Sequence, residues 1–333
     1  MSSYSASEAQ VKESQKNNKV EFYDFHPALA DLKQEVLTGL GSAQKNISPK
    51  FFYDEIGSKL FDDICGVPEY YPTRTEQDII TDNMDEIVDC IGQNCVLVEP
   101  GSGSSQKVCS LLDTVEPTAY MPMDISREHL INAANRIANE YDWLDVHAAC
   151  VDYTAPFDMP HDIPNARKVA FFPGSSIGNF EPEDAVTFLK LVAKMVGKDG
   201  GLLIGVDLKK HHETLNLAYN DAAGVTAAFN LNLLRRVNRE LGTDFDLMGF
   251  SHTAFYNETL GRIEMHLISE REQQVKLEDS TFDFAEGETI HTESSYKYSI
   301  DEFVSLAEKA GFESKQVWTD ENSLFSVHYF SLK

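Results

Sequence analysis

An apolar segment that runs directly into a glycine-rich turn is the feature that most constrains the fold of this 333-residue chain. Residues 96–107 read VLVEPGSGSSQK, and Gly101 and Gly103 follow a short run of strand-forming residues. Glycine lets the backbone turn sharply and approach a ligand without an intervening side chain. In a doubly wound sheet, a turn of this kind at the carboxyl end of a strand forms part of a ligand-binding crevice. The stretch therefore predicts an α/β fold with a nucleotide-type cofactor site.

The spacing of the glycines indicates which kind of cofactor the turn binds. A dinucleotide fingerprint requires a third glycine three residues after Gly103, where this chain has Gln106. The sequence Glu99-Pro100-Gly101-Ser102-Gly103 instead resembles the S-adenosylmethionine site of class I methyltransferases. Because short motifs often match by chance, an ordinary strand-to-helix turn stays open as the alternative.

After Val96 the chain alternates between strand and helix patterns, which favours a parallel sheet with helices on both faces. The carboxyl ends of parallel strands meet at one edge of such a sheet, so we expect Gly101, Asp124, Asp152 and Gly174 to converge on one crevice. The expected strands cover residues 95–99, 119–124, 145–152, 168–173 and 201–207, with helices such as 127–141 and 183–196 between them.

The region from about residue 209 to 289 interrupts this alternation and looks inserted. It contains a helical stretch over 216–241 and strand-like alternation over 252–269. The sheet pattern then resumes with a helix over 300–310 and an antiparallel pair over 315–319 and 326–332. We predict a class I, Rossmann-like fold with a second, smaller domain, divided as a disordered tail (1–19), a substrate-binding domain (20–73 and 209–296) and a methyltransferase domain (74–208 and 297–333).

The amino-acid composition limits the classes of molecule that the protein is expected to bind. A net charge of −26 argues against nucleic acid and anionic membranes, because both require clustered lysine and arginine. The five cysteines form no Cys-x-x-Cys pair and no zinc-type spacing, so we expect reduced thiols and no metal site. The polar first twenty residues lack the apolar core of a signal peptide, and no apolar run is long enough to cross a membrane. A cytoplasmic location is the expectation.

Four further residues are candidates for cofactor binding beside the glycines. Asp124 ends the second strand and can accept hydrogen bonds from ribose hydroxyls, although a helix N-cap is the alternative. Asp152 and Tyr153 close the third strand and could meet the adenine amine and ring, or could form a surface turn. Lys107, expected in the first helical turn after the glycines, could bind the cofactor carboxylate, although a solvated lysine is the commoner role.

Longer stretches carry a more specific resemblance that covers nearly the whole chain after the tail. They closely resemble the histidine Nα-methyltransferase family of ergothioneine biosynthesis, and they appear in the same order. The matching stretches are FFYDEIGSKLFD (51–62), PEYYPTRTE (68–76), FPGSSIGNF (172–180), AYND (218–221) and TIHTESSYKY (289–298). The resemblance implies that S-adenosylmethionine methylates the α-amine of L-histidine three times, which gives the betaine hercynine.

The resemblance also implies roles for particular residues around the reacting amine. Asn179 and Tyr53 would hold the amine near the methyl group and so act in catalysis, while Tyr70 and Tyr219 would bind the substrate carboxylate. Each has a plainer alternative: the tyrosines could be half-buried core residues, and Asn179 could cap the helix that begins near residue 181.

For the substrate ring, the resemblance implies recognition by Glu293 and Ser295, with Met265 as an apolar wall. A carboxylate is a strong acceptor for an imidazole N–H, and a second polar group can satisfy the other ring nitrogen. The alternative for Glu293 is an exposed loop carboxylate. The role of Arg74 stays open between a ligand carboxylate and a structural ion pair.

Three rival functions remain at this point. One is a sister methyltransferase for another amino acid, such as a tryptophan derivative, and another is a catalytically silent S-adenosylmethionine-binding module. A nicotinamide-dependent oxidoreductase is more distant, because the third glycine is missing. No sulfoxide synthase segment is fused to the chain, so we expect any downstream sulfur-inserting enzyme to be a separate protein.

Overall fold

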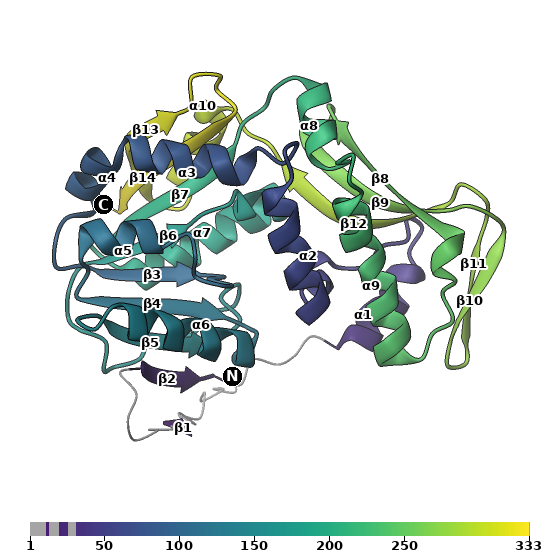
Figure 1. Ribbon diagram of the computed structural model, residues 1–333, viewed down its shortest axis with the longest axis horizontal. Coiled ribbons are helices and arrows are strands. Elements are labelled where there is room, and N and C mark those ends of the chain that lie inside the picture. The colour runs from purple at the N-terminus through teal and green to yellow at the C-terminus, as the bar shows by residue number, and fades with distance from the viewer. Residues whose placement is uncertain (1–10, 13–19, 26–30, 333) are drawn as a thin grey trace, which may run out of the picture.

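The computed structural model describes residues 11–12, 20–25 and 31–332, arranged as two lobes (Figure 1). The predicted tail over residues 1–19 lies outside the described residues, apart from β1 (Val11–Lys12). That short strand pairs antiparallel with β2 (Val20–Asp24). This pairing differs from the expectation of a wholly disordered tail.

The larger lobe contains a nine-stranded sheet in the order β1-β2-β5-β4-β3-β6-β7-β14-β13. Strands β2 to β7 run parallel, and β14 pairs antiparallel with both β7 and β13. The chain order reverses at β3, which is where ligands bind in doubly wound sheets. The class I, Rossmann-like α/β fold is therefore confirmed. The remaining strands are β3 (Val96–Pro100), β4 (Ala119–Asp124), β5 (Asp145–Cys150), β6 (Lys168–Phe172), β7 (Gly201–Asp207), β13 (Phe312–Thr319) and β14 (Phe325–Leu332).

Helices cover both faces of this sheet because each presents an apolar stripe to it (Figure 1). Ile79, Leu111 and Ile137 belong to the buried cluster on one face, and Phe188 and Phe303 belong to the cluster on the other. The first face carries α3 (Pro72–Asp82), α4 (Met84–Ile91), α5 (Cys109–Val115) and α6 (Arg127–Glu140), and the second carries α7 (Pro182–Val196) and α10 (Ile300–Glu308).

The smaller lobe is built on a three-stranded antiparallel sheet in the order β12-β9-β8. One hydrophobic cluster joins residues from about 32–71 with residues from about 215–290, which supports the predicted two-segment domain. The division itself stays a prediction. The elements of this lobe are α1 (Leu32–Leu40), η1 (Pro49–Phe52), α2 (Glu55–Gly66), α8 (His212–Ala218), α9 (Val225–Leu241), η3 (Leu247–Gly249), β8 (Phe250–Asn257), β9 (Arg262–Ser269), β10 (Gln273–Leu277), β11 (Ser280–Phe284) and β12 (Thr289–Tyr296).

Three boundaries differ from the sequence-based expectation. Residues 20–24 were expected in the second domain, but β2 pairs with β5 in the large sheet and satisfies backbone groups that the edge of β5 would otherwise expose. The helical stretch 216–241 is two helices, because the Asp221 carboxylate accepts hydrogen bonds from the first amides of α9 and Gly224 has a positive φ. The alternation over 252–269 is a hairpin of β8 and β9, whose turn contains Gly261 at positive φ.

A β-bulge in the pairing of β12 with β9 changes which side chains face each side of the sheet. His291 lies opposite His266, whereas Glu293 lies opposite Met265, with the register shift between them. Side chains alternate along a strand, and one extra residue shifts that alternation. Consequently His291 stacks on His266 at 4.8 Å on one face, while Glu293 shares the other face with Met265.

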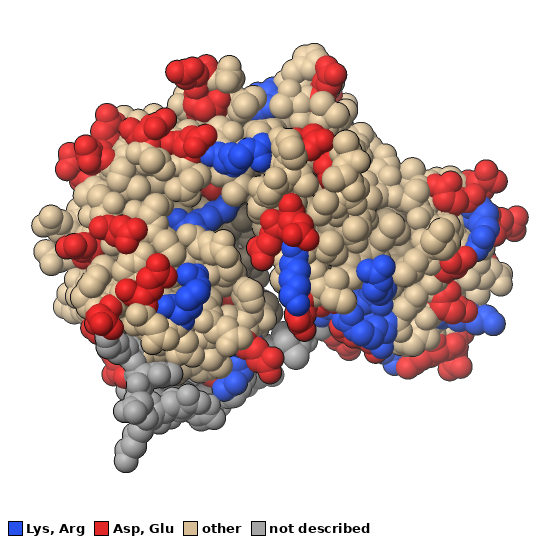
Figure 2. All heavy atoms as spheres, in the orientation of Figure 1, with Lys and Arg blue, Asp and Glu red and all other residues tan. Residues whose placement is uncertain are grey.

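None of the helices in the described ranges combines the length and the apolar character that crossing a bilayer requires. Acidic side chains are spread over the face drawn in Figure 2, and lysine and arginine form smaller groups between them. This distribution accords with the net charge of −26.

The buried His328 of β14 makes stability depend on pH. Its ring is 0 % exposed between Phe303 and Phe330, and its Nδ1 has no hydrogen-bond partner among the described residues. Burial therefore lowers the pKa of His328 to about 4. Between pH 6.5 and pH 4 the unfolded chain is protonated at this ring and the native chain is not, so stability falls as the pH falls through this window. The full loss is about 3 kcal/mol.

Urea unfolding at pH 7.5 and pH 5 measures this effect. We expect His328→Phe to remove about 2 kcal/mol of the acid-induced loss, because only part of the window is crossed at pH 5. The exposed His161 provides a matched control, and His161→Asn should leave the loss unchanged. An identical pH dependence in His328→Phe and the wild type would contradict the assignment.

Candidate active site

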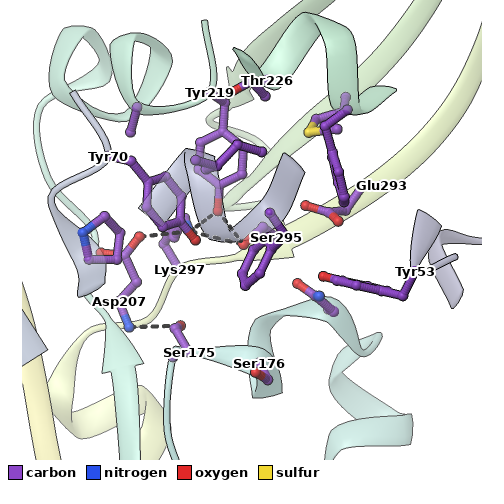
Figure 3. A pocket seen from close by; sticks show the side chains of 18 residues that line it. Tyr53, Tyr70, Ser175, Ser176, Asp207, Tyr219, Thr226, Glu293, Ser295 and Lys297 are labelled. Carbon is purple, nitrogen blue, oxygen red and sulfur yellow. Dashed lines mark hydrogen bonds and ion pairs between the residues drawn. The ribbon is translucent and has the colours of Figure 1, made fainter. Parts of the chain in front are cut away.

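A pocket lies between the two lobes, where the carboxyl ends of β6 and β7 approach α2, the α8–α9 connection and β12 (Figure 3). All seven predicted substrate residues line it, together with Gly174. The lining residues are Tyr53, Phe61, Ile64, Tyr70, Pro72, Gly174, Ser175, Ser176, Asn179, Asp207, Ala218, Tyr219, Thr226, Phe229, Met265, Glu293, Ser295 and Lys297.

Tyr53 and Asn179 reach the pocket from opposite lobes. Tyr53 follows η1, and its ring packs edge-on against Phe61 and Phe229 at 5.7 and 5.8 Å. Asn179 ends η2 (Ser176–Asn179), and it does not cap α7, whose N-cap is Glu181. Within the described residues, neither the Tyr53 hydroxyl nor the Asn179 amide has a hydrogen-bond partner. Both groups are therefore free to bind a ligand.

Tyr70 and Tyr219 meet edge-to-face, with ring centroids 6.0 Å apart. Tyr70 stands on the loop before α3, and Arg74 holds this loop by donating to the carbonyls of Val67 and Pro68. Arg74 therefore has a structural role in this loop, through backbone oxygens rather than through an ion pair with a described residue.

Tyr219 follows α8 and is held in place through its neighbour. The Asn220 side chain exchanges two hydrogen bonds with the backbone of Ala254 in β8, at 2.9 and 3.0 Å. This pair fixes the α8–α9 connection against the small sheet, so the Tyr219 ring points into the pocket.

Glu293, Ser295 and Lys297 come from alternate positions of one strand and its extension, and all three line the pocket. Met265 lies opposite Glu293 and is 2 % exposed. Burial raises the pKa of Glu293 to about 7, although the Lys297 charge opposes this shift. Among the described residues the Glu293 carboxylate accepts no hydrogen bond, so it is available to a ligand N–H.

Lys297 and Asp207 form a buried ion pair at the base of the pocket, and the sequence motifs predicted no role for either residue. The Lys297 Nζ lies 2.7 Å from Asp207 Oδ2, and the two side chains are 1 % and 0 % exposed. The Asp207 charge raises the pKa of Lys297 although burial opposes this. Lys297 also donates to Tyr219 and Ser295, at 3.1 and 2.9 Å. The alternation of Glu293 and Ser295 could have indicated Lys297 as the next inward residue.

The predicted cofactor residues lie along the carboxyl edge of the large sheet. Gly101 and Gly103 have φ angles of +68° and +51°, as the turn requires. The Gly103 N–H donates to Asp124 Oδ2 at 3.2 Å. The other Asp124 oxygen accepts from the Ser126 N–H at 2.8 Å, so this carboxylate also closes the turn before α6. A Cβ on Gly101 would lie 2.9 Å from the Tyr153 hydroxyl, which places Tyr153 against the glycine turn.

Glu76 contacts two of the other predicted residues, and although it ends the matching stretch 68–76, no role was predicted for it. Its side chain is 2 % exposed, pairs with Lys107 at 2.9 Å and accepts from the Gly174 N–H at 2.7 Å. Glu76 raises the pKa of Lys107 although burial opposes this. Lys107 was expected in the first turn of a helix, but α5 begins only at Cys109 because the glycine turn is longer than expected.

Two acidic residues of the strand ends have local partners. Asp152 Oδ1 accepts from the Thr154 N–H at 2.9 Å and from its hydroxyl at 2.6 Å, as in a surface turn. Glu99, which precedes the glycine turn, is 2 % exposed and accepts a hydrogen bond from the Tyr120 hydroxyl. The Asp152 role in cofactor binding stays a prediction.

A group of metal-ligand types also lies on the opposite face of β9 and β12 from the pocket. The ligand atoms of Glu264, His266 and His291 all lie within 4.8 Å of one another, although these residues do not have zinc-type spacing in the sequence. Glu264 already accepts hydrogen bonds from Arg262, Asn257 and His266 at 2.9, 3.1 and 3.1 Å.

Comparison with known proteins identifies the family. A family model described as histidine-specific methyltransferase, S-adenosylmethionine-dependent, matches residues 32–332. The histidine N-alpha-methyltransferase of Mycolicibacterium smegmatis is 41% identical over 303 residues, which are 89% of this chain and 93% of that protein. The protein of the same name from Mycobacterium tuberculosis is 37% identical over 303 residues, which are again 89% of this chain and 93% of that protein. Ergothioneine biosynthesis protein 1 of Neurospora crassa is 32% identical over 83% of this chain and 32% of its own length. The chain therefore belongs to the S-adenosylmethionine-dependent histidine-specific methyltransferase family.

Proposed function

We propose that this methyltransferase transfers three methyl groups from S-adenosylmethionine to the α-amine of L-histidine and so forms hercynine, the first step of ergothioneine biosynthesis. The unpartnered Glu293 carboxylate beside the Ser295 hydroxyl is the observation that carries the proposal. An acceptor next to a hydroxyl matches the two nitrogens of an imidazole ring. The names of the relatives support the same substrate.

The residues at the sheet edge fit S-adenosylmethionine as the cofactor. Gly101 and Gly103 leave the backbone bare at the end of β3, and no atom would contact a Cβ on Gly103 within 4 Å. We propose that Asp124 binds the ribose, that Asp152 and Tyr153 bind the adenine, and that Lys107 and Gly174 lie beside the amino acid portion. The position of Gly174 in the pocket lining supports a cofactor that reaches the substrate.

When bound, S-adenosylmethionine supplies an activated methyl group, so the protein mainly has to align the amine lone pair with it. Tyr53 and Asn179 are proposed to hold the amine, and alignment of this kind contributes about 7–11 kcal/mol. Burial raises the pKa of Tyr70 well above 10, and the surrounding pocket and the Glu293 charge raise that of Tyr53, although this residue is 43 % exposed. The two phenols are therefore neutral hydrogen-bonding groups rather than bases. We propose that water accepts the proton that the amine must lose before a transfer.

Mass spectrometry of the reaction products tests the proposal. Purified protein with S-adenosylmethionine and L-histidine should yield a product heavier by three methyl groups. Methylation of tryptophan or another amino acid instead would keep the fold and the cofactor but contradict the assigned ring pocket. No transfer to any amino acid, with the cofactor still bound, would favour the silent binding module.

Replacing Glu293 by alanine is expected to raise the KM for L-histidine about 10- to 100-fold, because a charge-assisted hydrogen bond to the ring N–H is lost. The KM for S-adenosylmethionine should change little. Steady-state kinetics with each substrate varied in turn measure both constants. Ser294 is the neighbouring residue on the same strand and does not line the pocket, so Ser294→Ala is the matched control. Equal increases in both KM values would contradict the role of Glu293.

The proposal includes a cytoplasmic location and a separate sulfur-inserting enzyme that consumes the product. All five cysteines are free in the structure, which supports a reducing compartment. The net charge of −26 supports small molecules rather than nucleic acid or anionic membranes as partners.

A further inference from the structure

We propose that Lys297 is a positioning residue that sets substrate specificity by turning the Ser295 hydroxyl into a hydrogen-bond donor toward the substrate ring. This inference rests on the proposed function, because it concerns the ring that the pocket receives. It begins with the three contacts of the Lys297 ammonium, to Asp207, Tyr219 and Ser295 (Figure 3).

An ammonium group can only donate hydrogen bonds. The oxygens of Tyr219 and Ser295 must therefore act as acceptors toward Lys297, at 3.1 and 2.9 Å. The Tyr219 hydroxyl in turn donates to Ser295 Oγ at 2.9 Å, so its single proton is directed to the serine and Tyr70 is left as the donor to the substrate carboxylate. A serine hydroxyl has two acceptor sites and one proton. With both acceptor sites used, the Ser295 oxygen can offer a ligand only its proton.

The donor character of Ser295 complements the acceptor character of Glu293, two residues earlier on the same strand face. Together they present one acceptor and one donor to the substrate side chain. A neutral imidazole has one N–H and one unprotonated nitrogen, and so matches both groups. An indole or pyrrole has an N–H but no acceptor nitrogen, so it would leave the buried Ser295 proton unsatisfied.

Burial holds Lys297 in this arrangement. Its side chain is 1 % exposed, and Asp207 beneath it is 0 % exposed. A second lysine, Lys210, pairs with the other oxygen of Asp207 and with the Tyr71 hydroxyl, and it contacts neither Tyr219 nor Ser295. The chain thus offers a matched control, because both lysines neutralise the same carboxylate and only Lys297 touches the pocket hydroxyls.

The test compares L-histidine with pyrrolyl-L-alanine, used as its 2- and 3-linked isomers, which keep a ring N–H but lack the second nitrogen. We expect the wild type to favour L-histidine in kcat/KM by about tenfold, the value of one unsatisfied neutral donor. Lys297→Met and Ser295→Ala should each reduce this preference to about onefold. Lys210→Met should retain it. Bound S-adenosylhomocysteine and thermal unfolding check that each variant is folded.

Two results would overturn the inference. An equal loss of kcat/KM for both substrates in Lys297→Met would assign the lysine to structure alone. Retention of the preference in Ser295→Ala, which leaves every buried charge in place, would exclude Ser295 as the donor. If Lys297→Met does not fold, the Asp207→Asn/Lys297→Met variant removes one charge of each sign and should show the same lost preference. Failure of the wild type to methylate L-histidine would instead contradict the proposed function.

Discussion

Replacement of Glu76 by alanine is expected to lower the free energy of unfolding by about 1–3 kcal/mol, the cost of leaving the Gly174 N–H and the 30 % exposed Lys107 ammonium without their acceptor. The side chain is 2 % exposed and serves both the Lys107 ammonium and the Gly174 N–H. Because those two residues are proposed to lie beside the cofactor, we also expect S-adenosylmethionine to bind more weakly. Chemical denaturation and calorimetric titration measure the two effects.

Glu86 provides the matched control for Glu76. It lies on the neighbouring helix α4, is exposed, and accepts a hydrogen bond from Trp318 at 2.8 Å. Glu86→Ala should cost about 1 kcal/mol or less. The Glu76→Ala/Lys107→Met variant should regain part of the lost stability, because no unpaired charge remains. A loss below 1 kcal/mol in Glu76→Ala itself would show that the pair contributes little.

Asn179→Ala is expected to reduce kcat about 100-fold, because small displacements of a reacting group have effects of this size. The amide has no partner among the described residues and faces the same pocket as Tyr53. The KM for S-adenosylmethionine should change little. Initial rates with saturating substrates measure kcat, and mass spectrometry shows whether mono- and dimethylated histidine accumulate.

Asn322 lies on an exposed loop and does not line the pocket, so Asn322→Ala should retain the wild-type kcat. The opposite pattern for Asn179→Ala, an unchanged kcat with a raised KM for L-histidine, would reassign the amide to ground-state binding rather than alignment.

The local pattern of apolar residues in the sequence was sufficient to predict much of the large sheet. Strands β4 and β7 have the predicted bounds, because unbroken runs of buried apolar residues mark central parallel strands. The break between α8 and α9 was missed because the helical pattern continues through it. It depends on the Asp221 carboxylate capping α9, a contact that composition does not display.

The substrate residues came from the family resemblance, and the pocket lining contains all seven of them. Glu76 and Lys297 escaped notice for a physical reason. Their partners Lys107 and Asp207 lie on other elements, so each becomes meaningful only after the chain has folded. A lysine in a sequence usually indicates a solvated surface, and only the completed core shows that this one is enclosed.

Because of the bulge at residues 291–293, an insertion or deletion of one residue in β12 would change which side chains face the pocket. Thr292, whose hydroxyl donates to the Met265 carbonyl, is the additional residue that turns Glu293, Ser295 and Lys297 toward the lobe interface. A homologue that lacks this single residue would keep Glu293, Ser295 and Lys297 in its sequence. It would direct their side chains to the opposite face of the sheet. In such a homologue, the loss of one bulge residue would change substrate preference without any substitution among the residues that contact the amino acid.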